Sequence, residues 1–167
     1  MVRVEAVLDS WKTVRADTAL AVEEFAELDY KPVADVMTFG EIATHILQAG
    51  YILTGAMLYG VADLSTPEFR GLFPRYIAQL PPHGTQAELA SALRSTMESR
   101  CAELAAKPPE FYSEMITRFD GQPVTRLEML QTVKEHELTH RSQMFMYLRL
   151  KGLVPATTRR RQAKAKA

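Results

Sequence analysis

Three capping boxes divide this chain into helices, and they constrain its fold more than any other feature. In such a box a threonine side chain accepts a hydrogen bond from the backbone N–H three residues later. The glutamate at that later position bonds back to the threonine N–H. The three pairs are Thr38 with Glu41, Thr85 with Glu88, and Thr125 with Glu128. Each pair predicts the first turn of a helix, where backbone N–H groups otherwise lack partners.

The ends of these helices are also predicted. Gly60 stops the helix that begins at Thr38, and Pro108 stops the one that begins at Thr85. The last helix runs to Gly152, with Pro155 beyond it, the usual order of residues at a helix C-terminus. A further helix over roughly 4–28 is predicted by apolar residues with a period of 3.6. They are Val7, Leu8, Trp11, Val14, Val22 and Phe25.

Long and short connections alternate between the four predicted helices. The long one, residues 61–84, holds four prolines, and residues 66–80 within it favour one or two short helices. Before the last helix, Asp120 and Gly121 favour a tight turn and a small hairpin. Together these features predict an all-α fold, a four-helix bundle with a long connection between its second and third helices.

Composition is that of a single globular domain. The chain has 167 residues, of which 47% are apolar and 24% charged. No stretch approaches the roughly 18 apolar residues that span a membrane, and the N-terminus lacks the apolar run of a signal peptide. We therefore expect a cytoplasmic protein that has no membrane partner.

The C-terminal residues differ in charge from the rest of the chain. Residues 159–167 carry five cations and no acid, which leaves 15 basic and 20 acidic side chains in residues 1–158. A body with a net charge of about −5 repels a phosphate backbone, so nucleic acid is a disfavoured partner. We expect one domain over 1–158 and a basic, disordered tail over 159–167, with contact to an anionic surface as the alternative.

Three of the four histidines lie on inward-facing stripes of predicted helices. His136 and His140 are one helical turn apart, about 6 Å along the axis, and His45 lies on another helix. Neutral imidazole is the commonest protein ligand for zinc. The residues alone leave two interpretations open: three ligands of one metal ion, or three core histidines each bonded to a carbonyl or hydroxyl group. We expect His83, in a loop, to be exposed and not to bind metal.

The residues around these histidines resemble the DinB/YfiT family of small helical-bundle metalloproteins. The resemblance is carried by KPVADVMTFGEIATHI and by RFDGQPVTRLEMLQTVKEHELTHRSQMFMYLRLKGLVP, and it covers nearly all of residues 4–155. The family has a histidine on its second helix and an H-x3-H pair on its fourth. Ser142 stands where the family usually has glycine, a position that should affect packing more than metal binding. The matching positions are His45, His136, His140, Arg141, Gln143, Lys151, Gly152 and Pro155.

The resemblance implies a bound metal ion and a class of chemistry. It implies one divalent ion per chain, zinc, nickel, iron or manganese, held by the three histidines, and a homodimer. Family members include thiol-dependent S-transferases and a mycothiol-dependent isomerase, in which the metal activates a low-molecular-weight thiol. We therefore expect an S-transferase acting on a small-molecule substrate, or a hydrolase that activates water. The alternative is a non-catalytic metal-binding protein of the stress response.

Several neighbouring side chains have predicted roles. Gln143, one turn beyond the histidine pair, is a candidate to orient the site or a bound water, and the alternative is that it caps the polar interior. Glu135 and Glu137 are expected to be solvated helix charges, and Arg141 a surface or dimer-interface cation. Cys101 lies on an apolar row and is expected in the core.

Overall fold

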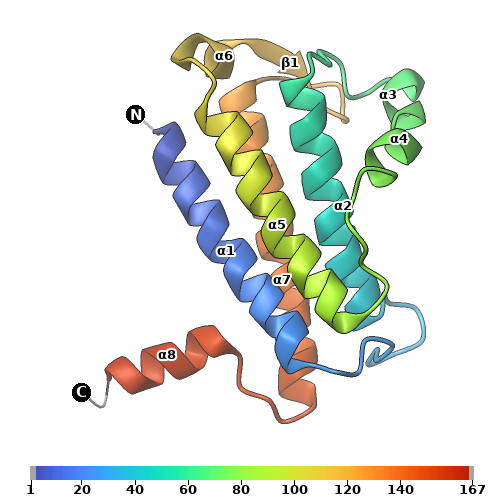
Figure 1. Cartoon of the computed structure of the whole chain (residues 1–167), viewed down its shortest axis with the longest axis vertical. Coiled ribbons are helices and arrows are strands. Elements are labelled where there is room, and N and C mark those ends of the chain that lie inside the picture. The colour runs from blue at the N-terminus through green and yellow to red at the C-terminus, as the bar shows by residue number, and fades with distance from the viewer. Residues whose placement is uncertain (1–2, 166–167) are drawn as a thin grey trace.

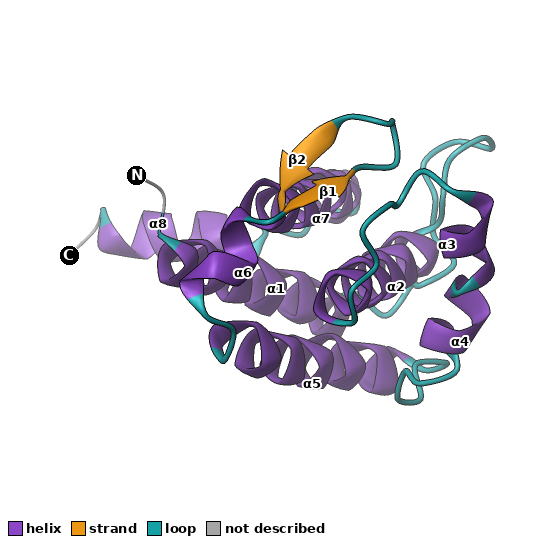
Figure 2. Ribbon diagram, turned by 90° about the horizontal axis from the view of Figure 1, so that it is seen from above, coloured by secondary structure: helices purple, strands orange, loops and turns teal. Residues whose placement is uncertain are grey.

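Four long helices lie side by side in the computed structural model, which describes residues 3–165. They are α1 (Val4–Glu24), α2 (Phe39–Leu58), α5 (Gln86–Ala105) and α7 (Arg126–Leu150). Helix α1 packs against α5 and α7, and α2 packs against the same two helices from the other side (Figures 1 and 2). The prediction of a mostly helical chain is confirmed. Within residues 3–165, none of the helices combines the length and the apolar character needed to cross a membrane.

All three predicted capping boxes form. At the start of α2 the Thr38 hydroxyl accepts from the Glu41 N–H at 3.1 Å, and the Thr38 N–H donates to the Glu41 carboxylate at 2.7 Å. The predicted glycine stops are also present, because Gly60 and Gly152 adopt φ angles of 83° and 77°. Only glycine adopts such angles without strain, so these two residues turn the chain out of its helices.

Helix α1 ends at Glu24, four residues before the predicted end near position 28. Phe25 takes an extended conformation, with φ −126° and ψ 100°. This turn buries its ring, whose centroid lies 4.6 Å from that of Phe39. Extended backbone at Phe25 lets its ring pack against Phe39, and the helix ends one residue before it.

The connections contain short elements at the predicted places. Between α2 and α5 two short helices form, α3 (Pro67–Gly71) and α4 (Phe73–Ile77), and they lie along the outer side of α2 (Figure 2). After α5 come helix α6 (Pro109–Ser113) and an antiparallel hairpin of β1 (Met115–Thr117) and β2 (Pro123–Thr125). Gly121 has a φ of 81° in its turn. The predicted hairpin is confirmed.

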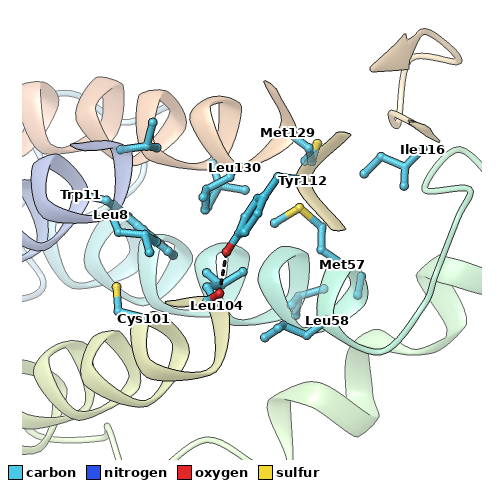
Figure 3. Close-up of a cluster of buried hydrophobic side chains, with 14 of the residues drawn as sticks. Leu8, Trp11, Met57, Leu58, Cys101, Leu104, Tyr112, Ile116, Met129 and Leu130 are labelled. Atoms are coloured by element: carbon cyan, nitrogen blue, oxygen red, sulfur yellow. Dashed lines mark hydrogen bonds between the residues drawn. The ribbon is translucent and has the colours of Figure 1, made fainter. Parts of the chain in front are cut away.

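The core is filled by apolar side chains from all four long helices. Figure 3 shows part of it, where Trp11 of α1, Leu104 of α5 and Leu130 of α7 meet. The Tyr112 hydroxyl reaches into this cluster and donates to the Leu104 carbonyl at 2.6 Å. Cys101 lies in the same cluster, as predicted, and burial raises the pKa of its thiol to about 11. The thiol is therefore protonated and packs as a small apolar residue.

The basic C-terminal segment is helical, which corrects the predicted disorder from residue 159. Helix α8 (Ala156–Lys164) extends sideways from the end of α7 and contacts α1 (Figure 1). Arg160 pairs with Asp17 at 2.5 Å, and Arg159 pairs with Glu24. Composition alone did not reveal these partners, because both acids lie more than a hundred residues earlier in the chain. Residues 166–167 of the predicted tail lie outside the described residues.

Candidate metal centre

The fold brings His45, His136 and His140 together. Helices α2 and α7 pack side by side, and one nitrogen from each of the three rings lies within 4.8 Å of the other two. The Nε2 atoms of His45 and His136 are 3.0 Å apart, although these residues are separated by 91 positions in sequence. All three side chains are half-buried.

The donor set fits a divalent transition-metal ion. Nitrogen ligands about 2.0–2.1 Å from zinc stand roughly 3 Å or slightly more from one another. The 3.0 Å separation of His45 and His136 matches this spacing. A hydrogen bond between two neutral rings also satisfies that pair, and His140 has a separate partner in Gln143. The ligand atoms that cluster among the described residues are three imidazole nitrogens, with no carboxylate oxygen. Such a set suits zinc, nickel or iron better than calcium or magnesium, which prefer oxygen ligands.

Gln143 holds the His140 ring from the side away from this cluster. The Nδ1 atom of His140 lies 2.8 Å from the Gln143 side-chain oxygen. An amide oxygen only accepts, so Nδ1 carries a proton, and in the neutral ring the lone pair is then on Nε2. This arrangement fixes the tautomer in which Nε2 can bind a metal ion.

Burial keeps His45 and His136 in the neutral form that a metal ion requires. Desolvation, together with the neighbouring His140 and His45, lowers the pKa of His136 to about 4. Desolvation also lowers the pKa of His45, and His140 adds to that effect. Both rings are therefore unprotonated at neutral pH and are able to act as ligands.

Glu137 corrects one prediction, because it is buried and not a solvated charge. Its side chain is 3% exposed and accepts from Arg15 Nε at 2.7 Å. The Trp11 indole N–H donates at 2.6 Å and the Thr18 hydroxyl at 3.0 Å. This network ties α7 to α1 directly beside His136. One face of α1 carries three hydrogen-bond donors at spacings of four and three residues: Trp11, Arg15 and Thr18. This pattern in the sequence could have indicated a polar partner on the helix opposite. Glu135, in contrast, is exposed as predicted.

Arg141 is predicted to be a surface or dimer-interface cation, and the surface part of this prediction is wrong. Its side chain is 14% exposed, and Nη1 lies 3.4 Å from the carboxylate of Asp17. Its guanidinium also lies over the Phe145 ring, 5.1 Å from the centroid. Asp17 therefore pairs with both Arg141 and Arg160 of α8. The arginine after the histidine pair thus helps to hold helices together.

A cavity of about 440 Å³ borders His45, whereas His136 and His140 do not line it. Thr44 and Gln48 of α2 line it, together with His83 from the loop before α5. His83 is half-buried, which corrects the prediction that it is exposed, and its Nδ1–H donates to the Pro81 carbonyl at 2.8 Å. It is not part of the three-histidine cluster. The cavity has space for a small molecule beside the histidines.

Comparison with known proteins agrees with this fold. The family model described as the DinB family matches residues 1–166. The crystal structure of a DinB-like protein from Bacillus subtilis, YjoA, is similar to this chain, with a TM-score of 0.66 and 21% sequence identity. The similarity covers 88% of this chain and 92% of that one. No curated protein matches the chain significantly.

Proposed function

Because the chain belongs to the DinB family, we propose that it binds one divalent metal ion through His45, His136 and His140. The observation that carries this proposal is the convergence of three ring nitrogens within 4.8 Å from two helices. The lowered pKa of His136 and the tautomer of His140 support it, since both leave neutral nitrogens available as ligands.

We further propose that the centre is catalytic and activates a small thiol or a water molecule. A divalent ion held by three protein ligands keeps positions open, where it would lower the pKa of a thiol or water and supply a nucleophile at neutral pH. Gln143 keeps His140 in the required orientation. The cavity beside His45 would hold the electrophile. The corresponding reactions are S-transfer from a thiol and hydrolysis.

Metal analysis tests the ligand assignment. After loading with zinc or nickel and removal of free metal, we expect elemental analysis to find about one ion per chain in the wild type. We expect His140→Ala to hold far less, because two imidazoles bind much more weakly than three. His83→Ala is the matched control, since it removes a histidine outside the cluster and should keep its metal. Equal metal content in His140→Ala and wild type would refute the assignment.

A thiol screen tests catalysis. Metal-loaded and metal-stripped protein would be incubated with low-molecular-weight thiols and a set of electrophiles, and thioether formation measured. We expect turnover only with metal bound, and its loss in His140→Ala. Hydrolysis in the absence of thiol would identify water as the nucleophile.

A non-catalytic role is the second candidate, and one observation favours it. The ligands come from α2 and α7, so an ion bound there would tie two packed helices together. A chelator then destabilises the protein, while no thiol or electrophile turns over at any metal loading. That combined result would favour the structural role over the catalytic one.

We also propose that the four long helices form the four-helix bundle of the family, and that two copies associate as a homodimer. Support for the dimer comes from exposed apolar side chains on α7 and just beyond it. Light scattering on the purified protein tests this, with Met146→Glu expected to shift a dimer towards monomer. The exposed residues are Leu138, Met146, Leu150, Leu153 and Val154.

A further inference from the structure

A second cavity, of about 450 Å³, lies far from the three histidines. It is formed where α4 passes the C-terminal end of α2. Tyr59 follows His45 by fourteen residues, about 20 Å along the helix axis. The two cavities share no lining residue. Those of the second are Tyr59, Val61, Leu72, Arg75, Tyr76 and Gln79.

The inner wall of this cavity depends on a glycine in α2. A Cβ atom at Gly55 would lie 2.6 Å from Cε1 of Tyr76 and 3.1 Å from Nη2 of Arg100. Both groups can therefore pack against α2 only because this position carries no side chain. Glycine weakens a helix interior, so its presence here is explained by the close approach of the tyrosine ring and the guanidinium group.

Arg100 places a buried positive charge behind this wall. Its side chain is 3% exposed, and its guanidinium lies 3.8 Å above the centroid of the Tyr51 ring. Nη1 donates to Glu103 at 3.0 Å and to the Tyr59 hydroxyl at 3.4 Å. Nε and Nη2 are buried, and within residues 3–165 they have no hydrogen-bond partner. The partly exposed carboxylate of Glu103 thus pairs with a guanidinium of which two nitrogens lack hydrogen-bond partners.

Two side chains of the cavity wall, Arg75 and Tyr76, offer donor groups that no described residue occupies. The Tyr59 hydroxyl donates to Glu103, and the Gln79 amide donates to the Arg75 carbonyl. Arg75 is exposed and forms no ion pair with any residue that the structure describes. The ring of Tyr76 is buried, and burial raises its pKa, so its hydroxyl is protonated and available as a donor. Among the described residues that line the cavity none is acidic, although the carboxylate of Glu103 lies 3.1 Å from the Tyr59 hydroxyl. Val61 and Leu72 give the cavity an apolar part. These features are complementary to an anion that carries an apolar body.

We propose that this cavity is a binding site for a small aromatic carboxylate. Arg75 and the Tyr76 hydroxyl receive the carboxylate, and the aromatic body lies against Tyr59 and Leu72. The site does not depend on the metal centre, because the two lie on different parts of α2.

An NMR titration of the zinc-loaded full chain with benzoate tests the proposal, with benzamide as the neutral analogue. We expect saturable amide shifts confined to residues 59–61 and 72–79, and binding of benzamide about tenfold weaker or worse. Arg75→Ala should weaken benzoate by a similar factor. Arg70→Ala is the matched control, because it removes an exposed arginine from neighbouring α3 without touching the cavity, and it should bind like the wild type.

Several results would overturn the site. Equal affinities for benzoate and benzamide would remove the role of the charge. Equal weakening by Arg75→Ala and Arg70→Ala would show only a general electrostatic effect. Shifts centred on residues 45, 136 and 140 would assign benzoate to the metal centre, and the absence of saturable shifts would exclude a carboxylate site.

Discussion

A buried carboxylate next to a candidate metal ligand is the clearest feature at the scale of single residues. Glu137 accepts hydrogen bonds from Arg15, Trp11 and Thr18, all on α1. The preceding residue, His136, faces α2 instead, and its Nε2 lies close to that of His45. Adjacent residues of one helix thus serve two contacts, one that holds α7 in place and one that contributes to the site.

Loss of this carboxylate should strongly destabilise the protein. Glu137→Ala leaves the buried guanidinium of Arg15 without its partner, and we expect a loss of about 3–5 kcal/mol in the free energy of unfolding. Urea denaturation measures this. Glu135→Ala is the control, because that exposed side chain should change stability by no more than about 0.5 kcal/mol. Similar effects of the two substitutions would show that the buried network contributes little.

The lowered pKa of His136 predicts a pH dependence of stability in the metal-free protein. Its pKa is about 4 in the fold, and an imidazole in an unfolded chain titrates near 6.5. Between these values the unfolded state binds more protons, so the free energy of unfolding falls as the pH falls from about 6.5 to about 4. Urea denaturation of metal-stripped protein at several pH values should show this decrease, and His136→Gln should reduce it. An unchanged slope in His136→Gln would mean that other groups cause the effect.

At the scale of elements, the starts of the helices are set by local hydrogen bonds. In α5 the Thr85 hydroxyl accepts from the Glu88 N–H at 3.2 Å, and the Glu88 carboxylate accepts from the Thr85 N–H at 2.9 Å. Both partners lie within four residues and are exposed to solvent. The position at which this helix starts is therefore set by residues close together in the sequence.

Removing one cap should have a moderate and local effect. Thr85→Ala leaves the first turn of α5 with an unpaired N–H, and we expect a loss of about 1 kcal/mol in stability, measured by thermal or urea denaturation. Ser91→Ala, an exposed position inside the same helix, should be neutral or slightly stabilising, since alanine is the better helix former. A loss in Ser91→Ala as large as that in Thr85→Ala would contradict the capping role.

At the scale of the whole molecule, the candidate site lies across the contact between α2 and α7. Its histidines come from two helices separated by α3, α4, α5, α6 and the hairpin. A ligand that binds only where both helices are packed must stabilise the folded state.

Metal should therefore raise the thermal midpoint. At a free metal concentration of one hundred times its Kd, we expect about 2.7 kcal/mol of added stability, roughly a 5–10 °C rise in Tm for a chain of this size. Differential scanning calorimetry with and without zinc measures it. The rise should persist in His83→Ala and disappear in His140→Ala, and a rise of equal size in both variants would place the ion elsewhere.

Interactions over one or two turns were predictable from the sequence because both partners stand within a few residues of each other. This holds for the three capping boxes, for the glycine stops at 60 and 152, and for the hairpin turn at Gly121. The helical period also placed the three histidines on inward faces, and family resemblance connected them into one site. Neither the helical period nor the family resemblance gives the distances between the three ring nitrogens.

Only the tertiary structure decided which charged side chains are buried. Glu137 pairs with Arg15 across 122 positions, Asp17 with Arg141 across 124, and Arg160 with Asp17 across 143. A charge that is solvated when judged from its own helix becomes a buried partner when another helix packs against it. The sequence by itself determined where the helices begin and which faces turn inward. The burial of polar groups, the order of the C-terminal segment and the earlier end of α1 followed from contacts between distant residues, whose energies exist only once the chain has folded.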